Sequence, residues 1–351
     1  MRVVFFNTYN QSFLSGFFLE LCDELSLRGH RVHVICLKGI HQVIERPSGV
    51  TVVVHKRQSK AKNYVQIFRL VKHYKPDVAV SNFSYVNPVV LSSWILGVKN
   101  NIVWFHTLKN QMNFNSRQIF IKSKFMKLSS KIITNSNELR QEVIAEYGQR
   151  NEKVIAIPFT TSIYNLESRP INLIKDEPLI YLGCPGRIDS DKNQKMLIDL
   201  LVHLNDMRYR VVFAGKNNLD VLKNHDHYES KKNQLVFLGN LSKEEMVSFY
   251  DDMDVIILPS LNEAFGLVLI EALASGSKTL VSHRFGALDY IKDHVEDLVF
   301  DPNNVHDLAT KLKRTLSNNH SKSYYKNIYF KYFSMDNVVK QFLSTIDCSR
   351  F

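Results

Sequence analysis

Residues 259–276 form the most informative stretch of the sequence and read Pro259-Ser-Leu-Asn-Glu-Ala-Phe-Gly-Leu-Val-Leu-Ile-Glu-Ala-Leu-Ala-Ser-Gly276. The apolar run Asp254-Val-Ile-Ile-Leu258 precedes it and has the form of a buried parallel strand. Residues 266–274 have the pattern of an apolar helix that stops at Gly276. In an open parallel sheet, ligands bind at such a strand–loop–helix junction, because the first helical turn presents N–H groups to a phosphate.

Two carboxylates flank this predicted anion site. Glu263 lies just before the helix and Glu271 about two turns inside it, so at a rise of ~1.5 Å per residue they are about 12 Å apart along the helix axis. Each could accept hydrogen bonds from a different hydroxylated ring at the two ends of a diphosphate. Because Glu271 sits among apolar helix residues, an unpaired carboxylate there would be costly and needs a partner.

Length and composition indicate a folded protein of two domains. The chain has 351 residues, 45% of them apolar. The apolar stretches fall short of the ~20 residues of a membrane span, and the N-terminus enters a strand directly, so we expect a cytoplasmic protein. Four widely spaced cysteines, with no CxxC pair, argue against a structural zinc site or a disulfide framework.

The excess of basic over acidic residues lies entirely in the first half of the chain. Residues 1–170 hold 23 basic and 10 acidic residues, whereas residues 171–351 hold 22 and 24. This asymmetry suggests that the N-terminal half meets an anionic partner, which could be a membrane surface, an anionic polymer or nucleic acid. The segment 116–128 interleaves basic and apolar residues as an interfacial helix would.

Both halves alternate short apolar strands with helical segments. In the first half we expect strands near residues 2–6, 31–37, 51–54, 78–82, 101–105 and 131–135. The first loop contains Ser15-Gly16 but no GxGxxG, so the fingerprint of nicotinamide binding is absent. Residues 154–176 have the character of a linker. The second half repeats the alternation, with strands near residues 179–183, 209–215, 235–240, 254–258 and 278–282.

The motifs of the second half follow one another in a distinctive order. Pro185-Gly-Arg187 is followed by Lys192, then by Phe237-Leu-Gly239, and then by Leu258-Pro-Ser-x-x-Glu-x7-Glu271. This order resembles the retaining glycosyltransferases of family 4, most strongly from about residue 179 to residue 302. A Glu-x7-Glu spacing alone is a weak signal, but its place after a strand and Pro-Ser makes it specific.

The resemblance implies an α/β protein with the GT-B fold. Two Rossmann-like, doubly wound domains would face each other across a cleft. The acceptor-binding domain would span residues 1–168 and the nucleotide-sugar donor domain residues 169–325. Residues 326–351 would form a C-terminal helix that crosses back to pack on the first domain.

The resemblance also implies a set of site residues. The donor-binding set is Gly186, Arg187, Lys192, Asn240, Leu241, Phe265, Gly266, Leu267 and Glu271. Arg187, Lys192 and the helix N-terminus would hold the diphosphate without a metal, which suits a leaving nucleoside diphosphate. Glu271 would accept the ribose hydroxyls, and the backbone around Asn240 would meet the base.

The remaining implied residues concern the transferred sugar and the acceptor. Glu263 would bind hydroxyls of the sugar and stabilise positive charge at the anomeric carbon. His106 would face the donor sugar, although a histidine at a strand end is as often purely structural. Ser15 and Gly16 would form a phosphate and acceptor loop. The first loop lacks the family's Gly-Gly pair, which weakens inference about the acceptor. Asp252-Met-Asp254 resembles a metal motif, but it lies at the N-terminal end of its strand, away from the ligand edge.

The function that follows is transfer of a sugar, with retention and without a metal or other cofactor, from a UDP-sugar to a hydroxyl of a glycan, lipid-linked or cell-surface polymer acceptor. UDP is a preference of the family. The expected setting is bacterial polysaccharide or cell-wall biosynthesis in the cytoplasm, peripheral to the inner face of the plasma membrane. One alternative is a sugar-nucleotide epimerase or hydrolase on the same fold. Another is a nucleic-acid-binding protein, although no nucleic acid is expected as a partner.

Overall fold

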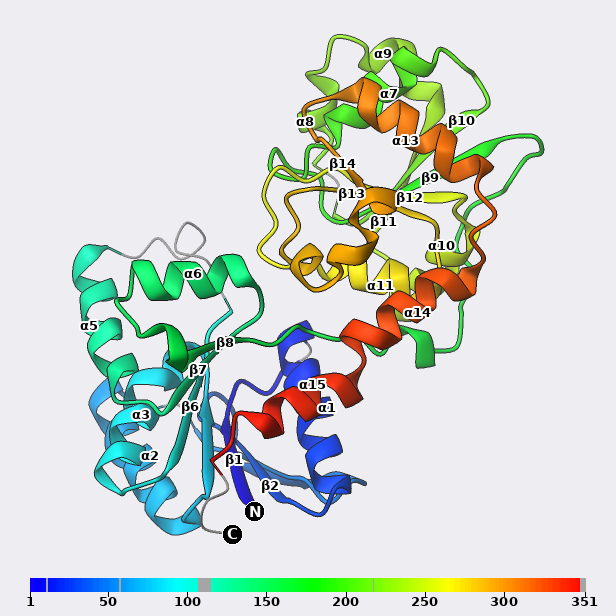
Figure 1. The fold of residues 1–351 in the computed structure, drawn as a ribbon. Coiled ribbons are helices and arrows are strands. Elements are labelled where there is room, and N and C mark those ends of the chain that lie inside the picture. The colour runs from blue at the N-terminus through cyan, green and yellow to red at the C-terminus, as the bar shows by residue number, and fades with distance from the viewer. Residues whose placement is uncertain (11, 57, 107–114, 217, 348–351) are drawn as a thin grey trace. The chain divides into compact units, whose positions relative to one another are not determined.

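The computed structural model describes residues 1–10, 12–56, 58–106, 115–216 and 218–347. The chain forms two compact units (Figure 1). Unit 1 comprises Met1–Phe159 and Met335–Phe351, and unit 2 comprises Thr160–Ser334. The sequence placed these divisions at residues 168/169 and 325/326, so each lies nine residues from its expected position. Three cysteines, Cys22, Cys36 and Cys184, are buried free thiols, and Cys348 lies outside the described residues.

Unit 1 is built on an eight-stranded sheet with the order β3-β4-β2-β1-β5-β6-β7-β8, parallel except for the β3–β4 pair. Its strands are β1 (Arg2–Phe6), β2 (Arg31–Cys36), β3 (Gln42–Glu45), β4 (Thr51–Val54), β5 (Val78–Ser81), β6 (Asn100–Trp104), β7 (Lys131–Thr134) and β8 (Val154–Ala156). Its helices are α1 (Phe13–Leu27), α2 (Lys60–Tyr74), α3 (Val86–Ile95), α5 (Ser116–Lys127), α6 (Asn137–Ala145) and α15 (Met335–Ser344).

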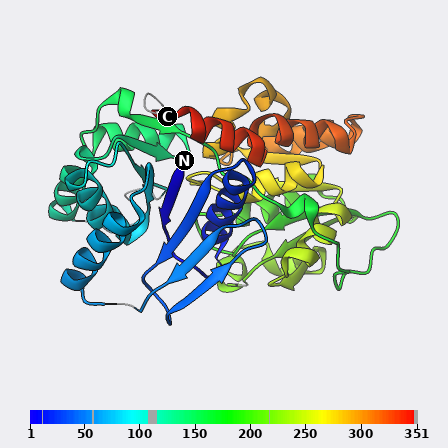
Figure 2. The same cartoon turned by 90° about the horizontal axis from the view of Figure 1, so that it is seen from below.

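Helices cover both faces of the unit 1 sheet, as the near-continuous apolar strands require. The helices α2, α3 and α5 lie side by side on one face, and α1 and α15 lie on the other (Figures 1 and 2). On the α1 face, Phe17, Phe18 and Phe342 surround the fully buried ring of Trp104. On the opposite face, Ile67 and other apolar residues of α2 and α3 pack on the strands.

Unit 2 contains a six-stranded parallel sheet with the order β11-β10-β9-β12-β13-β14. Its strands are β9 (Ile180–Pro185), β10 (Tyr209–Ala214), β11 (Leu235–Gly239), β12 (Val255–Leu258), β13 (Thr279–Ser282) and β14 (Val299–Phe300). Its helices are α7 (Lys195–Leu204), α8 (Asp220–Lys223), α9 (Tyr228–Lys231), α10 (Lys243–Asp252), α11 (Leu267–Ser275), α12 (Val295–Leu298), α13 (Val305–Ser317) and α14 (Lys322–Phe333).

The strand order of unit 2 indicates at which edge of its sheet a ligand site is expected. The chain runs outward from β9 to β11, then returns to β12 on the other side of β9, so the winding direction reverses between β9 and β12. Helices α7 and α13 pack on one face of the sheet, and α10, α11 and α14 lie on the other (Figure 1). In such sheets the crevice at the carboxyl ends of the strands beside the reversal is the usual ligand site. The loops after β9 and β12 carry five of the predicted donor residues; the others lie in α11 or directly after β11.

The linker and the C-terminus differ in detail from the sequence expectation. The expected linker, residues 154–176, begins as strand β8, which adds an eighth strand to the unit 1 sheet. The single C-terminal helix expected from residue 326 is two helices, α14 and α15, separated by Ser334 in an extended conformation. The helix α14 packs on α11 in unit 2, whereas α15 packs on α1 in unit 1, with Arg28 and Asp336 joined by a 2.6 Å ion pair.

Candidate functional site

Three loops are tied together at the carboxyl ends of the neighbouring strands β9, β12 and β13 in unit 2. The Leu261 N–H donates to the carbonyl of Asp191 at 2.8 Å, which ties the loop after β12 to the loop after β9. On the other side, the Gly286 N–H donates to the carbonyl of Glu263 at 3.1 Å, and the Ala287 N–H donates to that of Phe265 at 2.9 Å. The backbone carrying Glu263 is therefore held from both sides.

Gly266 starts helix α11 in a way that only glycine allows. Its φ is 99°, in the left-handed region, and a Cβ atom there would lie 2.1 Å from a ring carbon of Phe285. Within the described part of the chain, no side chain caps this helix end. The N–H groups of the first turn, which begins at Leu267, therefore point to the carboxyl edge of the sheet without a side-chain acceptor, and the helix dipole adds partial positive charge.

The structure brings Lys192 and Glu263 into direct contact. The Lys192 ammonium donates a short hydrogen bond to the Glu263 carboxylate, and their side chains are only 23% and 18% exposed. The sequence assigned them separate roles, on the diphosphate and on the sugar, and did not predict the pair. Because they lie 71 positions apart, only the folded loops show it.

Asp189 organises the loop that carries both predicted diphosphate ligands. Its carboxylate accepts the Lys192 backbone N–H at 2.9 Å and the Arg187 Nε–H at 2.6 Å. The buried side chain of Gln194 donates to the Arg187 carbonyl at 2.9 Å. The Arg187 side chain remains 72% exposed, and its terminal nitrogens have no hydrogen-bond partner among the described residues. The guanidinium is therefore available to an anion.

The neighbouring strand ends approach each other closely at two glycines. Gly215 follows β10 with φ 145°, and a Cβ there would lie 2.4 Å from the Gly186 carbonyl oxygen. Its N–H donates to the carbonyl of Gly239 at 2.7 Å, so β9, β10 and β11 end side by side. The sequence predicted Gly186 but missed Gly215, whose position at the end of a predicted strand was the available signal. Asn240 and Leu241 continue from β11 at this same edge, and the Asn240 side chain is exposed.

Glu271 has a protein partner that the sequence did not predict. The Tyr250 hydroxyl of α10 donates to its carboxylate at 2.9 Å. Burial raises the pKa of Glu271 to about 7, opposed by the Tyr250 hydrogen bond and by the charge of Lys243. Glu271 is nonetheless partly exposed as a residue. The carboxyl group thus has one acceptor position occupied by Tyr250 and can change protonation near neutral pH.

In unit 1, three neighbouring strands end in buried polar groups. Asn7 follows β1, Asn82 follows β5 and His106 lies just beyond β6. The strands β1, β5 and β6 are neighbours in the sheet. The Asn7 amide nitrogen, the Asn82 amide oxygen and both ring nitrogens of His106 are buried without a hydrogen-bond partner among the described residues. Such atoms require an explanation, and a ligand or water is one. The sequence predicted only His106 of these three.

The surroundings of His106 hold its ring neutral. Burial lowers the pKa of His106 to about 4, and the charge of Lys122 contributes to this lowering. The imidazole packs edge-on against Phe83, with 4.3 Å between ring centroids. Phe83 itself has φ 49°, a strained conformation of the kind that gathers at functional sites. A neutral imidazole of this kind can hydrogen-bond a sugar hydroxyl.

Ser15 and Gly16 have different local roles. Ser15 is fully buried, and its hydroxyl donates to the Thr8 carbonyl at 3.0 Å while it accepts the Asn10 N–H at 3.1 Å. It therefore shapes the first loop from inside. Gly16 lies in the first turn of α1, and a Cβ there would meet no atom within 4 Å. Local packing therefore does not require glycine at this position.

Asp254 of the Asp252-Met-Asp254 motif has a structural contact. The Asp254 carboxylate accepts the backbone N–H of Tyr181 at 2.7 Å, at the N-terminal end of β12. This places the motif at the edge of the sheet opposite to the ligand edge, as the sequence predicted. Among the residues that the structure describes, no three His, Cys, Asp or Glu side chains are grouped as metal ligands would be.

Comparison with known families matches both units. The family model described as Glycosyltransferase Family 4 matches residues 16–159, and the model described as Glycosyl transferases group 1 matches residues 166–330. The two matches follow the division between unit 1 and unit 2.

Curated relatives match part of the chain. An uncharacterized glycosyltransferase of Methanocaldococcus jannaschii is 29% identical over 232 residues, which are 61% of this chain and 58% of that protein. The serotype-specific mannosyltransferase WbdA of Escherichia coli is 26% identical over 200 residues, 53% of this chain and 24% of its own length. The chain thus spans less than two thirds of the length of either relative.

Solved structures match the chain almost end to end. A glycosyltransferase from Rickettsia africae superimposes with a TM-score of 0.75 at 18% identity, covering 98% of this chain and 97% of the other. Anabaena HepE in complex with UDP gives a TM-score of 0.73 at 15% identity, covering 98% and 99%. These likenesses establish a two-domain, Rossmann-like fold of the GT-B type. With the two family matches, they lead to one conclusion: this chain belongs to glycosyltransferase family 4.

Proposed function

We propose that the protein transfers a sugar from a nucleoside diphosphate sugar to an acceptor hydroxyl, with retention of configuration. The observation that carries this proposal is the carboxyl edge of the unit 2 sheet. There the exposed Arg187, the uncapped N-terminus of α11 and the partly exposed Glu271 lie on adjoining loops and helices. Cations and backbone N–H groups suit a diphosphate, and a carboxylate suits ribose hydroxyls.

The preferred nucleotide in this proposal is uridine diphosphate. A structural neighbour, Anabaena HepE, was solved in complex with UDP and also with UDP-glucose. These complexes are those of HepE, and they support the choice of UDP as the first nucleotide to test on this chain.

In the proposed reaction, the bond between the anomeric carbon and the diphosphate oxygen breaks, and its electron pair stays on the diphosphate. The acceptor oxygen forms the new bond on the same face of the sugar, and its proton passes to a phosphate oxygen. Arg187 and the α11 N-terminus would stabilise the charge that develops on the leaving group. No covalent nucleophile is required, and we propose that no metal is required.

The Lys192–Glu263 contact changes the proposed role of Glu263. A carboxylate already paired with an ammonium contributes less charge stabilisation at an anomeric carbon than an isolated one. We therefore propose that Glu263 positions the Lys192 ammonium for the diphosphate and accepts sugar hydroxyls with its second oxygen. His106, Asn7 and Asn82 of unit 1 are proposed to hydrogen-bond hydroxyl groups, since their buried atoms need partners.

A cationic face of unit 1 supports an anionic membrane surface as a partner. The helices α2, α3 and α5, which lie on one face of the unit 1 sheet, hold eight basic residues and no acidic one. The same helices also carry large apolar side chains that are 41–62% exposed, namely Val65, Trp94, Ile95, Phe120 and Ile121. Basic and apolar groups on one surface are typical of interfacial binding.

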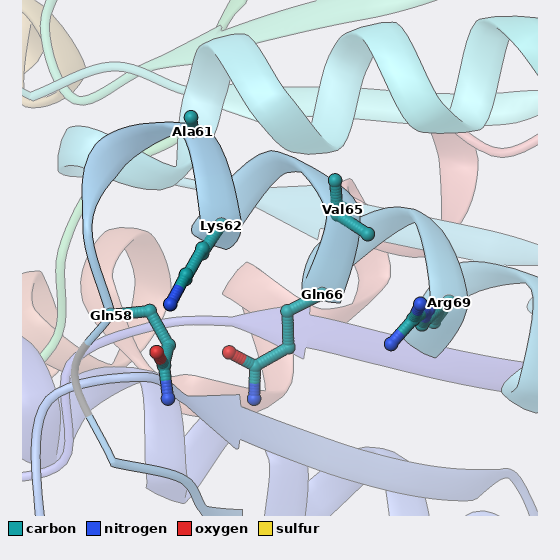
Figure 3. A pocket seen from close by; sticks show the side chains of 6 residues that line it. All are labelled: Gln58, Ala61, Lys62, Val65, Gln66 and Arg69. Atoms are coloured by element: carbon teal, nitrogen blue, oxygen red, sulfur yellow. The ribbon is translucent and has the colours of Figure 1, made fainter.

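A hollow beside α2 belongs to this cationic face. It has a volume of about 570 Å³ and is lined by Gln58, Ala61, Lys62, Val65, Gln66 and Arg69. In Figure 3, Lys62, Gln66 and Arg69 extend from the same side of the helix. We propose that lipid phosphates contact this side. No helix among the described residues is long and apolar enough to cross a bilayer.

Vesicle binding tests the membrane proposal. Each basic residue near an anionic surface contributes about 1 kcal/mol, so replacing Lys62, Arg69 and Lys124 by glutamine should weaken binding to phosphatidylglycerol vesicles about 100-fold. The matched control replaces Lys223, Lys292 and Lys313 of unit 2 and should bind as the wild type does. Equal loss in both triple variants, or none in the first, would contradict the proposal.

A ligand screen tests the proposed activity itself. Thermal unfolding is measured with UDP-, GDP- and ADP-sugars, and release of the free nucleoside diphosphate is followed over time. We expect one nucleotide class to raise the unfolding temperature by mass action. Product that keeps its nucleotide would indicate an epimerase, and nucleotide release without glycan formation would indicate a hydrolase. Strongly salt-dependent binding of DNA or RNA, with no nucleotide effect, would favour the nucleic-acid alternative.

A further inference from the structure

A cavity in unit 1 lies at the carboxyl edge of its sheet, on the α2–α3 face. It has a volume of about 340 Å³. Its floor comes from residues that follow β2 and β5, including Leu37, Lys38 and Tyr85, and its wall comes from α2 and the start of α3. It is distinct from the hollow of Figure 3, because the two share no lining residue.

The charged groups of this cavity are all cationic. Lys38 follows β2 and Lys60 opens α2, and among the described residues neither ammonium has an ion-pair partner. The Lys38 ammonium lies 5.7 Å from the centroid of the Tyr85 ring, which directs it over the cavity floor. None of the described lining residues is acidic. The cavity therefore favours an anionic group.

Polar but uncharged groups complete the lining. The Asn63 amide oxygen is buried and has no hydrogen-bond partner among the described residues, so it requires a donor from outside. The Tyr64 hydroxyl is bonded to the Asn87 side chain, and burial raises the pKa of Tyr64, which keeps the phenol neutral. The Tyr85 hydroxyl is fixed because it donates to Cys36 Sγ and accepts the Leu37 N–H at 2.8 Å. An acceptor oxygen beside two cations fits a ligand that carries both hydroxyl groups and a negative charge.

We propose that this cavity binds a hydroxylated anion, a sugar carrying a phosphate or a carboxylate. Lys38 and Lys60 would contact the anionic group, and Asn63 and Tyr64 would hydrogen-bond the sugar hydroxyls. Its identification as part of the acceptor, an anionic glycan or a sugar phosphate, rests on the proposed transferase function. The cavity volume is sufficient for one such sugar, since ligand pockets of about 300 Å³ are common.

Nuclear magnetic resonance titration tests the site without relying on catalysis. Amide signals of Leu37, Lys38, Asn63 and Tyr64 are followed as glucose 1-phosphate, glucuronate, inorganic phosphate and neutral glucose are added. At least one of the two anionic sugars should shift these signals, and which one does so distinguishes a phosphate from a carboxylate ligand. Inorganic phosphate and glucose should each bind at least about tenfold more weakly, because each satisfies only part of the lining.

Variants make the test specific to this cavity. Lys38→Gln with Lys60→Gln should weaken binding at these amides at least about tenfold, whereas the charge-matched pair Lys72→Gln with Lys127→Gln should leave it unchanged. Absence of shifts with both anionic sugars, equal binding of glucose, equal binding of inorganic phosphate, or an unaffected double variant would each overturn the proposal. Because the amide signals that are followed lie in unit 1, they report on this cavity even if unit 2 binds no nucleotide. Failure of the proposed function and failure of this cavity proposal are therefore distinguishable.

Discussion

Replacing Glu271 by glutamine should stabilise the protein without ligand and weaken its binding of nucleotide. Burial raises the pKa of this carboxyl to about 7, above its usual 4.5. At a pH between these two pKa values, the Glu271 carboxyl keeps its proton in the folded protein and has released it in the unfolded chain. Stability therefore falls as the pH rises through this range, because the unfolded state binds fewer protons than the folded one. Glutamine removes this cost, and its amide oxygen can still accept the Tyr250 hydroxyl.

The size of the effect follows from the pKa difference. One pKa unit corresponds to about 1.4 kcal/mol, so a shift from 4.5 to about 7 costs the folded state up to about 3 kcal/mol above pH 8. The value is an upper bound because Glu271 is partly exposed. The advantage of Glu271→Gln should grow from about 1 kcal/mol or less at pH 5 toward this bound at pH 8.

Urea unfolding at pH 5, 6, 7 and 8 measures this advantage. Tryptophan fluorescence would follow unit 1 only, because both tryptophans lie there. Hydrogen exchange of peptides from β12 and α11 is therefore used to follow the unfolding of unit 2. The control Glu229→Gln makes the same charge change on the exposed helix α9 and should stay within about 0.5 kcal/mol of wild type at every pH. The reasoning is refuted if Glu271→Gln is less stable than wild type at pH 8, or if its effect is independent of pH.

Three further changes test particular contacts. Gly266→Ala should destabilise unit 2 by about 2–6 kcal/mol, since strain at φ 99° and a clash with Phe285 add together, and adding Phe285→Ala should recover part of the loss in urea unfolding. Lys192→Met should cost about 1–3 kcal/mol by leaving Glu263 unpaired, and Lys192→Met with Glu263→Gln should cost less than the single change in a double-mutant cycle. Phe342→Ala should lower the unfolding free energy of unit 1 by about 3–5 kcal/mol, because it leaves a cavity beside Trp104. Tryptophan fluorescence measures this unfolding, and the control Lys340→Ala, at an exposed residue, should change the unfolding free energy little.

Much of the fold could be predicted from the sequence because its strands are short apolar runs. The strands β1, β5, β7 and β12 are buried on both faces, so local composition alone identifies them. The strand β3, Gln42–Glu45, was missed because it is a short, largely exposed edge strand with no such run. The helix break at Ser334 was also missed, although a serine followed by Asp336 is a signal for a new helix start.

The places of the candidate site residues in the fold could be predicted from the sequence, but their contacts could not. Arg187, Lys192, Gly266 and Glu271 lie on the loops and helices where the strand–loop–helix pattern placed them. The partner of Glu271 could not be predicted, because Tyr250 reaches it through the packing of α10 on α11. The Lys192–Glu263 contact likewise depends on how the loops after β9 and β12 are joined. Residues so far apart in the sequence are paired only through the packing of the loops and helices that carry them, so the sequence pattern alone does not predict the pair.

Calorimetric titration of UDP into the wild type and into Arg187→Gln, Lys192→Gln and Glu271→Gln tests the central claim that the carboxyl edge of unit 2 binds a nucleoside diphosphate. Arg208→Gln, which changes an exposed arginine paired with Asp206 before β10, is the control. We predict that wild type and control bind UDP alike and that each of the three site variants binds at least about tenfold more weakly, because each loses a hydrogen bond to a charged group. Equal UDP binding by wild type and all three site variants would contradict the account, as would failure of UDP, GDP and ADP alike to bind the wild type.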